Sequence, residues 1–296
     1  MAFRIILLFF IIGLPLSAQA QLRAQDGLAA LDAGDAMAAR AIWTPLAERG
    51  DVLAQYNLAV LLATDAGDQA DLEQAQHWFE AAAQQTHLGA QLALADMSAE
   101  QDDWQSAQHW YEAAAKAGAV RAQFALGKIL ERGLGTAPDP QQAIRWYQAA
   151  ADQGHRAAQF ALGAALAEQG QDDAAADWFE AAADQGHVEA RHNLALALAR
   201  GLGRPQDAAA ARRHYLRAVA AGYAPSTYNL ALMQAQGRGG VQNFRKALAL
   251  AMMAQSLGHG PAEHLIDALR EVMPADAIAQ AEGLVAQCET NPDLCG

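Results

Sequence analysis

A short motif that recurs along most of the chain limits most strongly how it can fold. Its first copy, AQYNL, begins at Ala54, and later copies begin at Ala90, Ala122, Ala158, Ala190, Ser226 and, in degenerate form, Ala262. Successive copies are separated by 36, 32, 36, 32, 36 and 36 residues. Self-similarity with a period of roughly 20 to 50 residues is typical of stacked repeat proteins, so we expect copies of one structural unit.

A second motif, A-x-x-W-Y-x-x-A, alternates with the first. Its apolar positions fall at i, i+3, i+4 and i+7, which is one face of an α-helix. The first motif has the same helical period, so each unit is predicted to be a pair of helices. The aromatic pairs of the second motif are Trp78-Phe79, Trp110-Tyr111, Trp146-Tyr147, Trp178-Phe179 and, with histidine in place of tryptophan, His214-Tyr215.

The turns between these helices differ in how constant they are. The turn from the second helix of one unit to the next unit has the same length in every copy, whereas the turn inside a unit varies. Longer copies of the inner turn carry Gly-x-Gly. The constant turn carries glycine where a helix is expected to end in a left-handed residue. These positions are Gly50, Gly118, Gly154, Gly186, Gly222 and Gly258, with Thr86 as the exception.

The ends of the chain differ from the middle, as stacked repeats require. From these differences we predict a signal peptide at 1–20, an N-terminal capping hairpin at 21–53, six repeats at 54–261, and C-terminal capping helices with a disulfide tail at 262–296. Cys288 and Cys295 are the two cysteines. Exported proteins commonly pair such cysteines, so we expect them to form a disulfide.

The N-terminus has the order of a secretory signal. Arg4 is followed by a ten-residue apolar run to Leu14 and by the small-residue segment Ala18-Gln19-Ala20. This order predicts cleavage after Ala20 and a periplasmic or secreted mature protein, with a buried first helix as the alternative. The apolar run is too short to span a bilayer, and nothing later approaches the required length, so no membrane span is expected.

The charge of the chain narrows its possible partners. The formal net charge is −13, from 33 acidic and 20 basic residues. Phosphate groups are repelled by such a surface, so nucleic acid is not expected as a partner. Partners with basic patches would be favoured, through steering more than through affinity.

The combined pattern G-x-x-x-A-Q-Y-N-L, G-x-G and A-x-x-W-Y-x-x-A-A resembles the Sel-like repeat (SLR) family, which is related to the tetratricopeptide repeats. The resemblance covers about Leu22 to Cys288. It implies an all-α fold, a right-handed α-solenoid of antiparallel helical hairpins whose first helices line the inner surface. It also implies a scaffold or adaptor that binds protein or peptide ligands. The 32-residue copies depart from the family because they lose the Gly-x-Gly turn.

Catalytic and cofactor signals are weak. The Gly-x-Gly triplets follow predicted helices, so they favour helix-ending turns over phosphate binding. The nine histidines lack the spacing of a shared metal site, and no cofactor or metal is expected. Asp102-Asp103 and Asp172-Asp173 precede second helices, where aspartate caps free N–H groups. The serines show no S-x-x-K motif.

One column of residues is the candidate partner site. It lies one residue after the glutamine of A-Q-x-x-L, where aromatic side chains could anchor a bound segment. Packing between repeats is the competing interpretation, because helical aromatic stripes are usually core. Asp96, Glu100, Lys128, Glu131 and Arg132 are polar candidates on the same helices. The aromatic column, as we call it, consists of Tyr56, Leu92, Phe124, Phe160, His192 and Tyr228.

These observations predict an exported, non-enzymatic SLR protein that acts as an interaction scaffold. The alternative is an enzyme directed at cell-wall or β-lactam substrates, which would be revealed by sustained nitrocefin hydrolysis. Some cysteine-rich SLR proteins have been linked to β-lactams, but the resemblance there implies a cysteine pair in each repeat. A structural spacer between envelope components is a third possibility.

Overall fold

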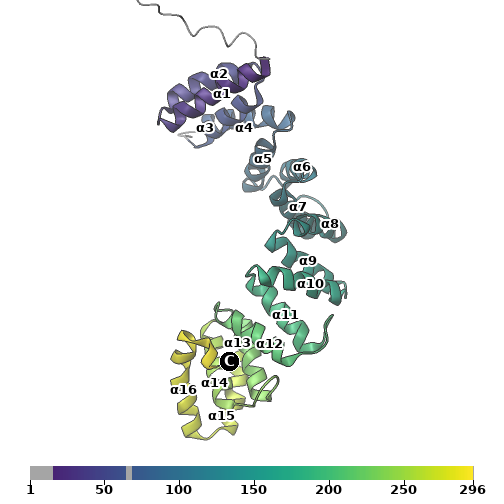
Figure 1. Ribbon diagram of the computed structural model, residues 1–296, viewed down its shortest axis with the longest axis vertical. Helices are drawn as coiled ribbons and strands as arrows, with labels where there is room; N and C mark the ends of the chain where they lie inside the picture. The colour runs from purple at the N-terminus through teal and green to yellow at the C-terminus, as the bar shows by residue number, and fades with distance from the viewer. Residues whose placement is uncertain (1–15, 65–68, 296) are drawn as a thin grey trace, which may run out of the picture. The chain divides into compact units, whose positions relative to one another are not determined.

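The computed structural model describes residues 16–64 and 69–295, so the predicted signal peptide lies mainly outside the described residues. The described chain is all-α, with sixteen α-helices and one short 3-10 helix, η1 (Figure 1). The helices are α1 (Leu16–Asp32), α2 (Ala36–Glu48), α3 (Val52–Thr64), α4 (Gln69–Gln84), α5 (Leu88–Glu100), α6 (Trp104–Lys116), α7 (Val120–Arg132), α8 (Pro140–Asp152), α9 (Arg156–Glu168), α10 (Asp172–Asp184), α11 (Val188–Arg200), α12 (Ala208–Val219), α13 (Ala224–Gln236), α14 (Phe244–Ser256), α15 (Ala262–Val272), α16 (Ala275–Thr290) and η1 (Pro292–Leu294).

The helices form two compact units, one ending at Asp139 and the other beginning at Pro140. Within each unit, successive helices pack against one another as hairpins, which confirms the predicted all-α hairpin fold. Odd-numbered helices from α3 to α13 carry the first motif, and even-numbered helices from α4 to α12 carry the second. Among the described residues, no helix is both long and apolar enough to cross a membrane.

The second motif builds the core because its two aromatic positions differ in burial. The second aromatic is buried, as in Tyr147 and Tyr215, and the alanines on either side are almost fully inaccessible to solvent. The tryptophan before it is half-buried. Alanine has high helix propensity and lets neighbouring backbones approach, so large aromatic side chains can fill the space between thin helices.

The glutamine of the first motif is buried and holds successive hairpins together. Gln159 donates from Nε2 to the carbonyl oxygen of Ala151 at 3.3 Å, and its Oε1 accepts from Gln185 at 2.7 Å. Each such bond reaches back eight residues, to the end of the preceding second helix. These bonds satisfy the buried amide nitrogens, which would be destabilising without a partner. Among the described residues, the buried Oε1 of Gln91 in this column has no hydrogen-bond partner. The equivalent bonds join Gln55 to Ala47, Gln91 to Ala83, and Gln123 to Ala115.

The constant turn has the left-handed conformation that its glycines predicted. All six of these glycines have φ between 75° and 89°, and Thr86 adopts φ of 64° in the same place. Only glycine enters this region without a steric penalty from a Cβ atom. The turn geometry is therefore preserved even in the copy that lacks glycine.

The Gly-x-Gly turns bring two hairpins together. The second glycine, Gly135, lies against Trp104 at the start of α6, and a Cβ atom there would be 2.7 Å from the Trp104 Cβ. Gly203 meets Asp172 and Gly239 meets Ala208 in the same way, each 31 residues after its partner. The second glycine thus permits close contact with the preceding hairpin.

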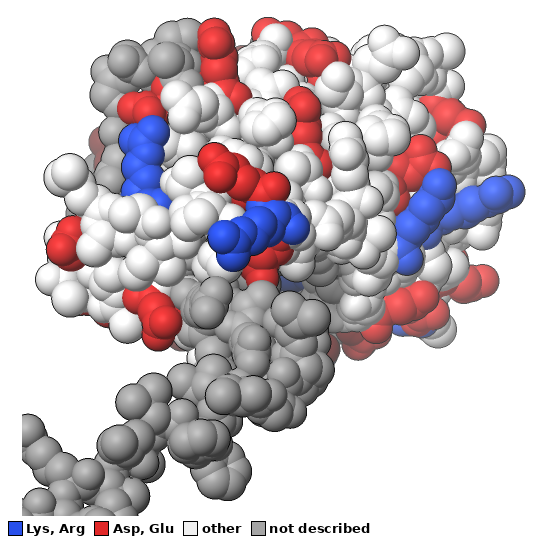
Figure 2. Space-filling view, turned by 90° about the horizontal axis from the view of Figure 1, so that it is seen from above, with Lys and Arg blue, Asp and Glu red and all other residues white. Residues whose placement is uncertain are grey.

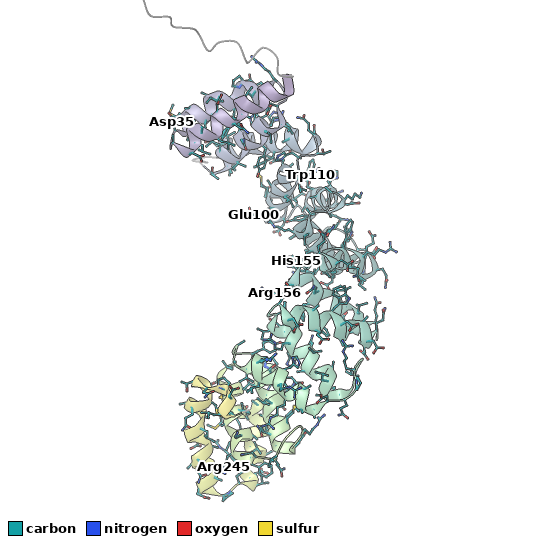
Figure 3. The ribbon with its side chains drawn as sticks, in the orientation of Figure 1. Asp35, Glu100, Trp110, His155, Arg156 and Arg245 are labelled. Atoms are coloured by element: carbon teal, nitrogen blue, oxygen red, sulfur yellow. A yellow bond between two sulfur atoms is a disulfide. The ribbon has the colours of Figure 1, made fainter. Side chains whose placement is uncertain are left out.

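In the first unit, α1 and α2 form the terminal hairpin. Trp43 is buried on α2 and donates from Nε1 to the carbonyl oxygen of Ala24 at 2.9 Å. Gly27 leaves room for the Trp43 ring, which an added Cβ atom would overlap. Asp35, labelled in Figure 3, caps α2 by accepting from the amide of Ala38. Trp43 therefore takes the place of the buried aromatic in the later hairpins.

In the second unit, the last helices close the stack differently from the repeats. Both α15 and α16 pack against α14. Cys288 and Cys295 form a disulfide with 5.7 Å between Cα atoms, and η1 inside this loop contacts α16 and α12. Gln234 of α13, itself buried, donates to the carbonyl oxygen of Cys295 at 2.8 Å. The tail is therefore fastened to the preceding repeat by a buried hydrogen bond as well as by the covalent loop.

The paired acids take two different places. Asp103 is the N-cap of α6, where its Oδ1 accepts from the amide of Ser106 at 3.1 Å, as expected. Its pKa is lowered, first by the hydrogen bonds with Ser106. Asp172 and Asp173 lie inside the first turn of α10, after the N-cap Gln171. For this second pair the capping prediction is wrong, because the pair stands two residues further along the repeat than Asp102-Asp103, beyond the N-cap position. The carboxylates still complement the helix dipole.

Candidate interaction site

The aromatic column lies between successive repeats, with each side chain half-buried. Tyr56 packs on His87 with 4.3 Å between ring centroids, and Phe160 stacks on His187 at 4.5 Å. His87 and His187 are themselves N-caps, because each accepts from a backbone amide through Nδ1. Burial lowers the pKa of both histidines, which favours the neutral form that can accept. The column therefore supports the junctions between repeats and also presents ring surface to solvent.

His192 and Tyr228 continue this arrangement in the second unit. Tyr228 packs on His259 at 4.8 Å, and His192 packs on Tyr215 and Tyr223. His192 Nδ1 lies 2.9 Å from Ser226 Oγ, a pairing that superficially resembles a serine–histidine dyad. Ser226 is fully buried, so its hydroxyl cannot meet a substrate. The pair serves to satisfy two polar groups in a packed junction.

A pocket in the first unit brings the aromatic column together with basic side chains. It has a volume of about 260 Å³ and lies between α5, α6 and α7. Trp104 and Phe124 supply half-buried aromatic surface, and Ile129 supplies a buried aliphatic wall. Its lining residues are Ala99, Trp104, Tyr111, Arg121, Phe124, Ala125, Lys128, Ile129, Arg132 and Leu134.

A hydrogen-bonded network at one side of the pocket holds Arg121. The Tyr111 hydroxyl donates to Asp96 Oδ1 at 2.6 Å, and Arg121 Nη2 donates to Asp96 Oδ2 at 2.6 Å. Burial, followed by the interactions with Asp96, raises the pKa of the Tyr111 hydroxyl far above its usual range. Tyr111 therefore stays protonated, and Asp96 fixes one edge of the guanidinium. A guanidinium has five N–H donors, so others remain for a ligand.

The basic residues lie along one face of α7. Arg121, Lys128 and Arg132 all line the pocket, and their spacing of seven and four residues places them on one helical stripe. The Lys128 ammonium lies 5.7 Å from the centre of the Phe124 ring. Among the described residues, only Arg121 of these three has an ion-pair partner. In a chain of net charge −13, this stripe places three basic side chains on one helix face, and Asp96 offsets the charge of Arg121.

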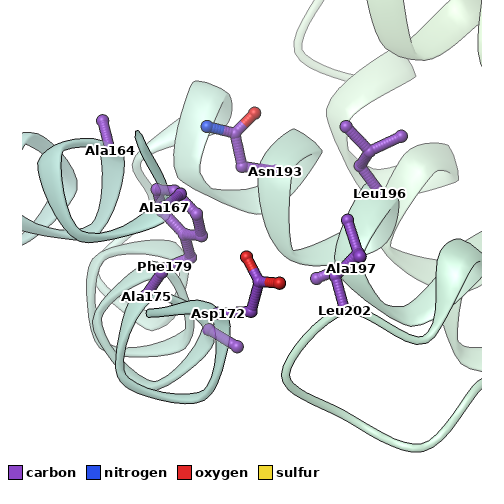
Figure 4. Close-up of a pocket in the computed structure, with 10 residues that line it drawn as sticks. Ala164, Ala167, Asp172, Ala175, Phe179, Asn193, Leu196, Ala197 and Leu202 are labelled. Carbon is purple, nitrogen blue, oxygen red and sulfur yellow. The ribbon is translucent and has the colours of Figure 1, made fainter. Parts of the chain in front are cut away.

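The second unit has an equivalent pocket with different chemistry. It measures about 240 Å³, lies between α9, α10 and α11, and is lined mainly by alanine, Phe179 and Leu202. In Figure 4 the Asp172 carboxylate points into this space, with the Asn193 amide on the opposite side. Its residues stand 68 positions after their counterparts in the first unit, so Leu196 replaces Lys128. This pocket is apolar with an acidic edge.

The polar network is replaced as a set in this second pocket. The counterparts of Asp96, Tyr111 and Arg121 are Ala164, Phe179 and Glu189. Because Phe179 has no hydroxyl to donate, position 164 needs no hydrogen-bond acceptor and carries alanine. Because Ala164 has no carboxylate, an arginine at position 189 would have no ion-pair partner there. The two pockets share a backbone frame but offer a ligand opposite charges.

Sequence reasoning placed Phe124, Lys128 and Arg132 near a site but missed Trp104 and Arg121. The overlooked signal is turn length. Both pockets occur where a hairpin with a three-residue inner turn, α5–α6 or α9–α10, is followed by a first helix with a seven-residue turn. Because the inner turn is short, the space beside the start of the second helix stays uncovered. The long turn of the next hairpin covers only part of this space.

Comparison with known protein families agrees with this architecture. The Sel1 repeat model matches residues 52–87, 90–118, 120–155, 156–187, 188–223 and 224–259, which is more than half of the chain. The chain belongs to the Sel1 repeat family. Such repeats typically mediate interactions between proteins. No curated protein matches its sequence.

Solved structures with the same repeat are similar over most of the chain. The protein c5321, a protective antigen in uropathogenic Escherichia coli strains that displays an SLR fold, is 26% identical with a TM-score of 0.68; the similarity covers 90% of this chain and 60% of c5321. The chain thus spans about three-fifths of the length of that protein. A Sel1 repeat protein from Oxalobacter formigenes is 25% identical with a TM-score of 0.56, covering 78% of this chain and 96% of that one.

Proposed function

We propose that this chain is an exported, non-catalytic adaptor that binds peptide segments of other proteins. The observation that carries the proposal is the pocket between α5, α6 and α7, where aromatic surface and basic groups lie side by side. Aromatic and arginine side chains are the most frequent contributors to binding energy at protein interfaces. The pocket is of a size to receive one or two side chains rather than a whole domain.

In this function the aromatic column has two roles. One ring face packs at the junction between repeats, and the remaining surface is available to a partner. Tyr56, Phe124, Phe160, His192 and Tyr228 therefore remain candidate partner-binding residues. Phe124 is the strongest of them because it lines the pocket.

Affinity capture from cell-envelope extracts tests this function. We expect the mature protein to retain specific partners, and the variant F124A to lose them while keeping its melting temperature within a few degrees. F244A, which removes an exposed ring at the start of α14, is the control. Equal recovery by wild type and F124A would contradict a role for this pocket.

Two further measurements test the other parts of the proposal. Mature protein isolated from the periplasm or medium should begin at Gln21, as the predicted cleavage requires. The same preparation should not turn over nitrocefin. Sustained hydrolysis would contradict the non-catalytic function and revive a β-lactam-directed enzyme.

A further inference from the structure

The stripe on α7 fits one kind of ligand better than others. Resting on the proposed peptide-binding function, we infer that the first-unit pocket selects an extended peptide segment with two acidic side chains separated by a single residue. An apolar side chain two residues beyond this acidic pair would lie on the same face of the peptide. The acidic side chains would contact Lys128 and Arg132, and the apolar side chain would lie against Phe124 and Trp104.

Helix geometry supports this spacing. Lys128 and Arg132 are four residues apart, which at 1.5 Å per residue is about 6 Å along the helix. In an extended peptide, side chains on the same face recur every second residue, about 6.6 Å apart. Two carboxylates separated by a single residue therefore match the two cations without bending the peptide.

Arg121 extends the stripe in the opposite direction. It is seven residues before Lys128, about 10 Å along the helix, and Phe124 lies between them. Because Asp96, itself held by the Tyr111 hydroxyl, already binds the guanidinium, less side-chain entropy is lost when a ligand binds it. Arg121 would thus receive a carboxylate or a backbone carbonyl from the part of the segment beyond the apolar side chain.

The acidic charge of the rest of the chain restricts acidic segments to the first-unit pocket. A net charge of −13 repels acidic segments in general, so an acidic peptide gains only where positive charge is concentrated. The equivalent pocket in the second unit lacks the Lys128 and Arg121 charges and carries Asp172 instead. It would reject the same segment, which makes it a comparison site within one molecule.

The experiment is a peptide selection on the full mature protein. Random heptapeptides are displayed on phage with their C-termini joined to the coat protein, so that no free terminal carboxylate can bind. We expect enriched sequences to contain two Asp or Glu residues separated by one residue, with an aromatic or aliphatic residue two positions beyond the pair. Selection on the variant K128Q/R132Q should lose this pattern.

Affinity measurements then show how much the acidic side chains of the peptide contribute to binding. An enriched peptide, synthesised with acetyl and amide ends, should bind wild type about tenfold more tightly than its Glu→Gln version, because two charge-assisted contacts are lost. K128Q/R132Q should remove that difference. K116Q, which removes an exposed lysine of α6 paired with Glu112, should retain it.

The outcomes distinguish the inference from the function on which it rests. Binders without acidic enrichment, or binders equally tight to K128Q/R132Q, would overturn the inference and leave peptide binding intact. Failure to select any saturable binder would overturn both. A protein dimer that dissociates in K128Q/R132Q would show that the stripe receives a second copy of this chain, which would also overturn the inference.

Discussion

Thr86 occupies the place that glycine holds in the equivalent turns, and its φ of 64° is unfavourable for a β-branched residue. Its side chain is exposed. We expect T86G to raise the free energy of unfolding by about 0.5–1 kcal/mol, because relief of strain outweighs the greater freedom of glycine in the unfolded chain. Urea denaturation measures this change.

The matched control is G118T, which places threonine at φ of 89° in another copy of the turn. It should lower the free energy of unfolding by about 1–2 kcal/mol. A destabilised T86G would mean that the threonine side chain contributes more than its conformation costs.

His192 links the packing of the second unit to pH. Burial, with a smaller contribution from His259, lowers its pKa to about 4. In the unfolded chain the histidine would bind a proton near pH 6.5, so between these values the unfolded state binds more protons. The contribution of His192 to the free energy of unfolding is therefore fully present above pH 6.5 and is lost as the pH falls toward 4.

We therefore expect H192F to lose less stability than wild type between pH 7 and pH 5, measured by urea denaturation at each pH. Phenylalanine is a suitable replacement because Phe124 and Phe160 occupy the same column. H109F, which changes a histidine outside the column, should follow wild type. Equal losses in wild type and H192F would show that this histidine does not titrate as its burial requires.

At the scale of elements, the C-terminal loop depends on both its disulfide and Gln234. Closing a loop with a sequence separation of seven residues is worth about 2–3 kcal/mol in the chain-entropy model. We expect C288A/C295A to lose about that much stability and to exchange amide hydrogens faster in α16 and η1. Reductant should reproduce the effect in wild type and leave the double variant unchanged; a response of the double variant would point to another cause.

The hairpins and their constant turns could be predicted from sequence because both depend on local patterns. Alanine and aromatic spacing determines which helix face is buried, and glycine marks the left-handed residue that ends the helix. The Gln159 column could not be predicted in this way, since a polar residue beside alanine usually indicates a solvent-facing position. Its burial follows only when the carbonyl of Ala151 is placed beside it.

The pocket depends on relations between repeats and was therefore only partly predictable. Phe124 was proposed from its column, and Lys128 and Arg132 from their position one and two turns later. Trp104 enters the site because Gly135, 31 residues away, packs against it. Arg121 enters because it is bound by Asp96, which the Tyr111 hydroxyl holds in place. Neither relation follows the repeat period.

At the scale of the whole molecule, acidic charge prevails. Acidic side chains are scattered over the face shown in Figure 2, with isolated basic side chains among them. This distribution favours approach by partners with basic regions, through steering. The first-unit pocket, in contrast, favours a short acidic segment of a partner. A partner carrying a basic surface and a short acidic–apolar segment would satisfy both.

Photo-cross-linking with a selected acidic peptide tests most directly the claim that this repeat protein binds partners at the first-unit pocket. The peptide carries a benzophenone in place of its apolar side chain, and adducts on the mature protein are located by mass spectrometry. We expect adducts on Trp104 or on the α7 segment from Arg121 to Arg132, reduced by excess unlabelled peptide and absent in K128Q/R132Q. Adducts concentrated elsewhere, or unchanged in that variant, would contradict the account.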